Sequence, residues 1–124
     1  MKIKCGTDII EIYRIQDSID TIGERFIKRV FTPKEIEYCE SKLQQKYQHY
    51  AARFAAKEAA FKAVSENLSD KYALSWQDVE IENDENGRPQ IHINKINTEL
   101  IENIDLSISH CKEYACANVV VLYK

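Results

Sequence analysis

The sequence AARFAAKEAAFKA (residues 51–63) decides the fold, because its spacing predicts an amphipathic helix. At about 3.6 residues per turn, large apolar side chains recur on one side of such a helix and form a buried stripe. The stripe consists of Tyr50, Phe54, Phe61 and Val64. Glu58 lies at its edge and Lys62 follows one turn later, while the alanines around them leave the backbone open to a ligand. The stretch therefore predicts both a core element and a candidate site.

Helical periods extend outward from this stretch over residues 11–67 and contain two start signals. Thr32-Pro33-Lys34-Glu35 is a capping box with proline at the first helical position, so a helix is expected to begin at Pro33. Thr21-Ile22-Gly23-Glu24 is a second capping box. The sequence allows either one helix from residue 33 to residue 67 or two helices that meet near residues 41–46.

Strand-like patterns flank the helical block on both sides. Residues 2–10 predict a first strand, and a hairpin is expected around the Asn86-Gly87 turn. Residues 104–109 and 114–123 predict a second antiparallel pair, and Asn97 or Thr98 is suited to begin a short helix through Ile101. This order is typical of an α+β fold with a mainly antiparallel sheet packed against a helical block. A single domain over residues 1–124 is expected.

The composition favours a globular protein and argues against one that spans a membrane. The chain has 124 residues, 44% hydrophobic, with 17 basic against 20 acidic side chains and a formal charge of −3. No apolar run approaches the roughly 20 residues of a membrane helix, and Asp8 and Glu11 interrupt any N-terminal signal sequence. The four cysteines form no C-x-x-C pair and are expected to be reduced and mostly buried. We therefore expect a cytoplasmic protein without membrane or nucleic-acid partners.

Asp8 is the second candidate site residue, since aspartate is disfavoured inside an apolar strand and a buried charge needs a partner or a metal. Two carboxylates beside apolar segments suit Mg²⁺, which takes its other ligands from water and substrate phosphates. With Lys62 facing those phosphates, Asp8 and Glu58 make a constellation for phosphoryl-group transfer. The alternative is an ordinary Glu58–Lys62 pair on a solvated helix face.

A basic segment opposes the overall negative charge. Residues 22–34 contain four basic side chains against one acidic side chain, Glu24, a local charge of 4 − 1 = +3. A basic helix that displays Phe26 and Ile27 beside these charges, with Arg14 nearby, suits an acidic helical protein. The alternative is a solvated amphipathic helix whose Phe26 belongs to the core.

Two separated motifs carry a family resemblance. Gly6-Thr7-Asp8-Ile9, followed by Arg53-Phe54-Ala55-Ala56-Lys57-Glu58-Ala59-Ala60-Phe61-Lys62-Ala63, resembles the signature of the holo-acyl-carrier-protein synthases, the small phosphopantetheinyl transferases. The similarity continues through Ser75–Val79, Asn86–Pro89 and Ser107–His110. It implies the phosphopantetheinyl transferase fold and transfer of 4′-phosphopantetheine from coenzyme A to a serine of an acyl carrier protein, in support of fatty acid biosynthesis.

The resemblance also implies a set of site residues. Asp8 and Glu58 would bind Mg²⁺ or Mn²⁺, Lys62 would contact the pyrophosphate, and Arg53 and His110 would reach the adenosine 3′-phosphate end of coenzyme A. A basic carrier-binding surface is implied, made of Arg14, Arg25, Phe26, Lys28 and Arg29. One departure is that residues 64–70 lack the glycine-rich turn usual after this helix, which bears on coenzyme affinity and carrier identity.

Association between subunits is expected from Val119-Val120-Val121-Leu122, whose side chains alternate between both faces of a sheet. The helical block covers only one face, so a second subunit is expected on the other. The number three, a homotrimer with shared sites, is implied by the resemblance alone. Two competing functions stay open: a non-catalytic carrier-protein-binding module and a Mg²⁺-dependent nucleotide phosphohydrolase.

Overall fold

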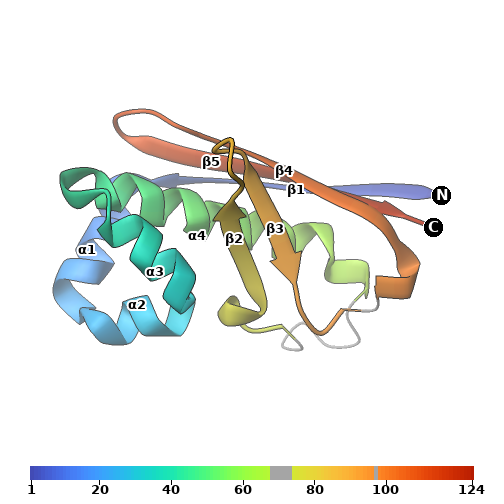
Figure 1. The fold of residues 1–124 in the computed structure, drawn as a ribbon, viewed down its shortest axis with the longest axis horizontal. Coiled ribbons are helices and arrows are strands. Elements are labelled where there is room, and N and C mark those ends of the chain that lie inside the picture. The colour runs from blue at the N-terminus through green and yellow to red at the C-terminus, as the bar shows by residue number, and fades with distance from the viewer. Residues whose placement is uncertain (68–73, 97) are drawn as a thin grey trace.

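The computed structural model describes residues 1–67, 74–96 and 98–124. A three-stranded antiparallel sheet with strand order β1-β5-β4 forms one layer, the longest helix α4 lies along it, and a β2–β3 hairpin covers the helix further out (Figure 1). The two chain ends lie at the same end of the molecule (Figure 1). The strands are β1 (Lys2–Glu11), β2 (Val79–Asn83), β3 (Pro89–Ile93), β4 (Ile101–His110) and β5 (Tyr114–Tyr123).

The helices gather at the opposite end of the molecule and beneath the sheet (Figure 1). They are α1 (Ile12–Ile22), α2 (Glu24–Val30), α3 (Pro33–Glu40) and α4 (Lys46–Ala63), with short 3-10 turns η1 (Leu43–Gln45), η2 (Ser65–Asn67), η3 (Trp76–Asp78) and η4 (Thr98–Leu100). The predicted α+β order is confirmed, and the predicted antiparallel pairing is divided between two sheets.

The start of α3 is confirmed in detail. The Thr32 hydroxyl accepts a hydrogen bond from the Glu35 amide at 3.3 Å, and the Glu35 carboxylate accepts one from the Thr32 amide at 2.8 Å. The helical block after Pro33 consists of two helices, because η1 and the positive φ of Leu43 (56°) interrupt it.

The second predicted capping box is wrong. Thr21 lies in the last turn of α1, where its hydroxyl donates to the Asp17 carbonyl at 2.6 Å. Gly23 ends that helix with φ of 79°, and α2 begins at the next residue. Glycine adopts such a positive φ without steric cost, so the helix ends there, and the threonine is a helical residue that caps nothing.

The exposed face of α4 also differs from the prediction. Ala51, Ala55 and Ala59 are fully buried, whereas Phe54 and Phe61 are only half-buried. Small side chains let the helix approach the sheet closely, so the alanine face packs inward and is not open to a ligand. At the closest point, a Cβ built on Gly6 of β1 would lie 2.1 Å from the Ala59 carbonyl oxygen, a distance that only glycine permits.

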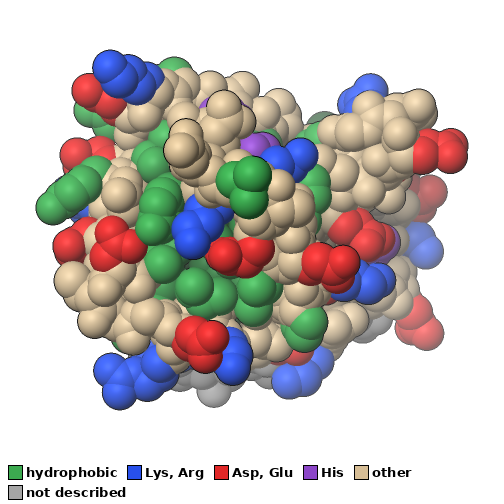
Figure 2. All heavy atoms as spheres, turned by 60° about the vertical axis from the view of Figure 1, so that its left-hand side comes forward, with side chains coloured by type: hydrophobic (Ala, Val, Ile, Leu, Met, Phe, Trp, Pro, Cys, Tyr) green, Lys and Arg blue, Asp and Glu red, His purple; other side chains and the backbone are tan. Residues whose placement is uncertain are grey.

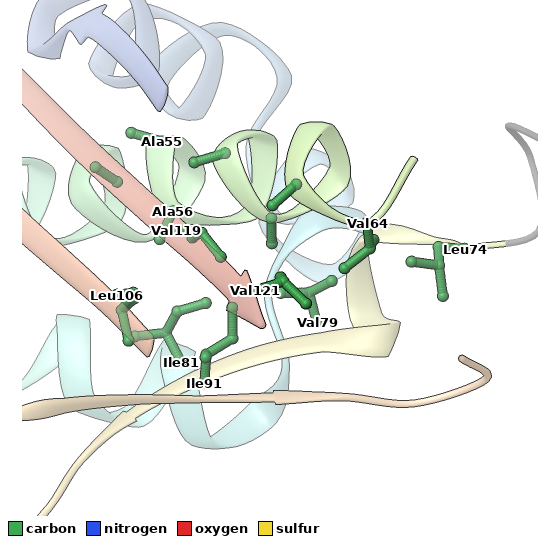
Figure 3. Packing of buried hydrophobic residues seen from close by; sticks show 14 residues of the cluster. Ala55, Ala56, Val64, Leu74, Val79, Ile81, Ile91, Leu106, Val119 and Val121 are labelled. Atoms are coloured by element: carbon green, nitrogen blue, oxygen red, sulfur yellow. The ribbon is translucent and has the colours of Figure 1, made fainter. Parts of the chain in front are cut away.

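Apolar side chains from both sheets meet α4 in one core cluster. Figure 3 shows Ala56 of α4, Val119 of β5 and Leu106 of β4 directed toward Val79 and Ile81 of the hairpin. The hairpin turns at Asn86-Gly87 as expected, with Gly87 at φ of 81° and its amide donating to the Asp84 carbonyl at 2.9 Å. The prediction for Asn97 and the end of the glycine-free segment, residues 68–70, lie outside the described residues.

The second face of the three-stranded sheet is open in the single chain. Val119 and Val121 are buried beneath it, while Val120 is 38% exposed and Ile3 and Ile9 of β1 are 70% and 68% exposed. The cysteines are all free, but only Cys39 is buried, so the expectation of mostly buried thiols is wrong. In the part of the chain that the structure describes, no helix combines the length and apolar character needed to cross a membrane.

Candidate active site

The site forms where β1 crosses α4. Asp8 from the strand and Glu58 from the helix line one cavity of about 440 Å³, together with Arg14, Phe54 and Tyr114. Asp8 shares a sheet face with Gly6, the residue that contacts the α4 backbone, because side chains two residues apart point the same way. Two carboxylates distant in sequence are therefore held at one opening by a backbone contact.

Lys62 completes this group. Its ammonium donates to the Thr7 carbonyl at 2.9 Å and forms an ion pair with the Asp8 carboxylate at 3.3 Å. The lysine side chain is 54% exposed, so it can reach a ligand at the mouth of the cavity. The structure thus pairs Lys62 with Asp8 on the neighbouring strand, and the simple Glu58–Lys62 surface pair does not describe this site.

The charge state of Glu58 reflects its surroundings. Burial raises the pKa of Glu58 above its usual value of 4.5, the nearby Asp8 carboxylate raises it further, and Lys62 partly offsets the rise. Like charges held together in a partly desolvated site favour a proton or a cation. Within the described residues, no cluster of three or more His, Cys, Asp or Glu side chains is arranged to hold a metal. The donor set is therefore two carboxylates, which suits a hard cation that completes its shell with water and phosphate oxygens.

A second polar group lies five residues before Glu58 on the same helix. Arg53 is 3% exposed, its guanidinium lies 4.0 Å from the centre of the Tyr38 ring, and it donates to the Asn83 side chain at 3.3 Å. Its Nε has no hydrogen-bond partner in the described part of the chain. A buried donor without a partner marks a position where an acceptor from a ligand would be stabilising.

His110 lies beside this arginine group at the end of β4. Its ring is 5.7 Å from the ring of His49, and His49 in turn contacts Tyr38 with 5.4 Å between ring centres. Burial, followed by the charges of Arg53, His110 and Lys42, lowers the pKa of His49 to about 4. The sequence-based reasoning missed His49, although its place one turn before Arg53 on the predicted helix was a usable signal.

Comparison with known proteins decides the family. Residues 4–119 match the family model described as the 4′-phosphopantetheinyl transferase superfamily. The chain belongs to this superfamily. A holo-[acyl-carrier-protein] synthase of Protochlamydia amoebophila is 47% identical over 97% of this chain and 98% of its own length. One from Ruminiclostridium cellulolyticum is 43% identical over 98% of this chain and 92% of its own.

Solved structures of superfamily members share the fold. The holo-[acyl-carrier-protein] synthase of Helicobacter pylori in complex with coenzyme A gives a TM-score of 0.81 at 32% identity, over 95% of this chain and 99% of that one. The Bacillus anthracis synthase, in complex with CoA (3′,5′-ADP), gives 0.79 at 35% identity over 95% and 94% of the two chains.

The basic residues of this transferase that were predicted to bind the carrier lie on the surface of α1 and α2. Arg25, Lys28 and Arg29 are exposed, and Lys28 pairs with Glu24 at 3.4 Å. In Figure 2, which turns the end carrying α1 to α3 forward, hydrophobic side chains gather between acidic and basic ones. Phe26 requires a correction: it is only 7% exposed, because its ring packs against Phe31 in the core. The predicted display of Phe26 to a partner is therefore wrong.

The transferase fold also contains a buried ion pair that the sequence-based reasoning missed. Lys57 and Glu35 are both fully buried, with 2.8 Å between the ammonium and a carboxylate oxygen. Lys57 also donates to the carbonyls of Trp76 and Val79, and the other Glu35 oxygen accepts from the Ile81 amide. The pair therefore joins α3, α4 and β2.

Proposed function

We propose that this chain transfers 4′-phosphopantetheine from coenzyme A to a serine of an apo acyl carrier protein, releasing adenosine 3′,5′-bisphosphate. The observation that carries the proposal is that Asp8 and Glu58 line one cavity of a superfamily member and that Lys62 is paired with Asp8. The relatives named as holo-[acyl-carrier-protein] synthases over nearly their full length support the same reaction.

Asp8 and Glu58 would hold Mg²⁺, with Mn²⁺ as the substitute. The raised pKa of Glu58 supports this role, because a cation between two carboxylates relieves their repulsion. Such a cation supplies Lewis-acid stabilisation of charge on the phosphate oxygens. A site with two protein carboxylates leaves coordination positions for those oxygens.

The protein side chains supply positioning and electrostatic stabilisation, the main contributions to phosphoryl-group transfer. In the structure Lys62 forms an ion pair with Asp8. With coenzyme A bound, its ammonium would turn to the pyrophosphate and stabilise the charge that develops on the leaving phosphate. Glu58 lines the same cavity as Phe54. The Glu58 carboxylate is the candidate acceptor of the carrier serine proton.

The nucleotide end of coenzyme A would bind at the group around Arg53. The unpartnered Nε of Arg53 and the adjacent rings of His49 and His110 offer donors to the 3′-phosphate and flat surfaces to the adenine. The two complexes of relatives that contain coenzyme A or its 3′,5′-ADP portion support a substrate of this class.

The carrier protein would dock on α1 and α2. Arg14 lines the cavity of Asp8 and Glu58, and Arg25, Lys28 and Arg29 lie on the exposed surface of the next helix. An acidic helical carrier would meet these charges, and its serine would then lie near the cavity.

The open sheet face supports association with further copies of the chain, and the resemblance to the synthase family supports the number three, a homotrimer. Ile3, Ile9 and Val120 leave an apolar surface on β1 and β5 that a second copy would cover. We place this trimer in the cytoplasm, where it would serve fatty acid biosynthesis. Light scattering coupled to size exclusion tests the assembly, and a monomer that keeps full activity on dilution contradicts it.

The reaction is tested by incubating the protein with coenzyme A, Mg²⁺ and a panel of apo carrier proteins, followed by intact-mass spectrometry. The expected result is a carrier that gains one phosphopantetheine group. Carrier binding without a mass change supports the non-catalytic module instead. Release of phosphate or nucleotide without carrier modification supports the phosphohydrolase.

A further inference from the structure

Helix α2 carries three of the proposed carrier-binding side chains, yet it is short and has few anchors of its own. It spans Glu24–Val30, and only Phe26 and Val30 of its residues are buried. Gly23, with φ of 79°, precedes it without a side-chain cap. A helix of this length is not stable by itself, so its position must depend on contacts with neighbouring elements.

Gln77 of η3 provides such a contact at the other end of α2. Its side-chain amide donates to the carbonyls of Lys28 and Phe31, the latter at 3.0 Å. Carbonyls at a helix C-terminus lack partners within the helix, and a side-chain donor from elsewhere satisfies them. One exposed glutamine thus joins the last turn of the basic helix to a segment far away in sequence.

The segment that carries Gln77 is fixed on both sides. Lys57 donates to the carbonyls of Trp76 and Val79 at 2.8 and 2.6 Å, and these two residues flank Gln77 and Asp78. Asp78 accepts from the Ser75 amide at 2.8 Å and closes η3 as a capping box. The backbone around Gln77 is therefore held by a fully buried lysine of α4.

The same segment is tied to the active-site cavity through aromatic contacts. The Trp76 ring stacks on Phe54, with 5.0 Å between ring centres, and Phe54 lines the cavity with Asp8 and Glu58. Lys57 precedes Glu58 in α4. A continuous set of contacts therefore leads from the cavity through η3 to the carbonyls of Lys28 and Phe31.

We propose that Gln77 is a positioning residue, which holds α2 at a fixed place relative to Glu58 and so sets the affinity for the acidic carrier protein. This inference rests on the proposed transfer reaction and on docking of the carrier at α2. Gln77 touches neither substrate in this assignment. Its effect passes through the backbone of α2 to Arg25, Lys28 and Arg29.

The test is the variant Gln77→Met, which keeps the length of the side chain and removes both amide donors. Gln90→Met is the matched control, since Gln90 is an exposed residue of β3 outside this set of contacts. Steady-state kinetics are measured with the carrier varied at saturating coenzyme A, and then the reverse. For Gln77→Met we expect KM for the carrier to rise about fivefold, as for loss of hydrogen bonds near a solvent-exposed helix end. KM for coenzyme A, kcat and the melting temperature are expected to match the control.

Amide hydrogen exchange gives a second measurement that needs no turnover. The α2 amides, Phe26 to Val30, are expected to exchange faster in Gln77→Met than in the parent, with the amides of α4 unchanged. A parental KM for the carrier with parental exchange in α2 overturns the positioning role. Equal rises in both KM values also overturn it, because they indicate a general distortion of the site. If the parent itself transfers nothing, the proposed reaction fails, and the exchange experiment still decides whether Gln77 holds α2.

Discussion

The consecutive residues Lys57 and Glu58 of helix α4 each belong to a group of carboxylates and ammonium ions. The two groups differ in how many of their polar atoms have hydrogen-bond or ion-pair partners within the protein. The inner group, Lys57–Glu35, is fully buried, and its atoms all meet protein partners. The outer group, Asp8–Glu58–Lys62, borders a cavity and leaves Lys62 half exposed. A satisfied group stabilises one structure, whereas a partly satisfied one has capacity left for a cation and phosphates.

Breaking the inner group has the largest expected effect. Lys57→Met leaves the Glu35 carboxylate buried without its cation, so the free energy of unfolding is expected to fall by about 3–5 kcal/mol. Urea denaturation followed by circular dichroism measures the loss. Adding Glu35→Gln removes the unpaired charge and is expected to restore part of the stability. A single variant as stable as the parent would show that the pair contributes little.

Breaking the outer group is expected to affect turnover and leave the fold intact. Asp8→Asn or Glu58→Gln removes an anionic oxygen from the proposed cation, and kcat/KM is expected to fall on the order of 10²- to 10³-fold. Initial rates are measured over a range of Mg²⁺ concentrations, with the melting temperature as the control for folding. Near-parental rates at low Mg²⁺ would refute the assignment of these carboxylates.

The contact at Gly6 tests how the outer group is held. Gly6→Ala places a methyl group 2.1 Å from the Ala59 carbonyl oxygen, so α4 must shift away from β1. Overpacking of this kind costs about 1–3 kcal/mol, and we expect the shift to lower activity as well by separating Glu58 from Asp8. Gly87→Ala is the matched control, because an added Cβ meets nothing within 4 Å there, although φ is positive. Equal rates for the two variants would contradict a role for the Gly6 contact in the site.

A change of charge on the exposed surface of α2 is expected to affect carrier binding and to leave both ionic groups of α4 intact. Arg25→Glu is expected to weaken carrier binding about tenfold, while coenzyme A binding stays unchanged. Added salt is expected to weaken carrier binding by the parent protein in the same way. Isothermal titration calorimetry with each substrate measures both effects. Equal losses for the two substrates would argue against a separate carrier surface.

The smallest expected effect is on the pH dependence of stability. Because the pKa of Glu58 is raised in the folded state, that state binds more protons just above pH 4.5, and the free energy of unfolding decreases as pH rises through this range. Glu58→Gln removes this contribution. The free energy of unfolding of the variant, relative to that of the parent, is therefore expected to be higher at neutral pH than at pH 4. Denaturation at both pH values measures it. A pH-independent difference would mean that Glu58 titrates normally.

The sequence predicted the outer group better than the inner one, for a physical reason. Asp8 and Glu58 conflict with their local patterns, an acid in an apolar strand and an acid at the edge of an apolar stripe, and such conflicts are visible in sequence. Lys57 does not conflict with the helical pattern around it. Its burial was not predictable, because its partners Glu35 and the Trp76 carbonyl come from elements that are distant in sequence. The alanine face was misassigned for the same reason, since only the close approach at Gly6 shows why small side chains are buried.

The backbone contact between Gly6 and Ala59 has a consequence for redesigning this protein. The hairpin side chains Val79 and Ile91 belong to the same core cluster as Ala59, whose carbonyl faces Gly6. Core libraries directed at the hairpin therefore need a screen for activity beside the one for thermostability, because a shift of α4 would change the separation of Asp8 and Glu58. Libraries that touch the strand side of α4 would change both properties at once.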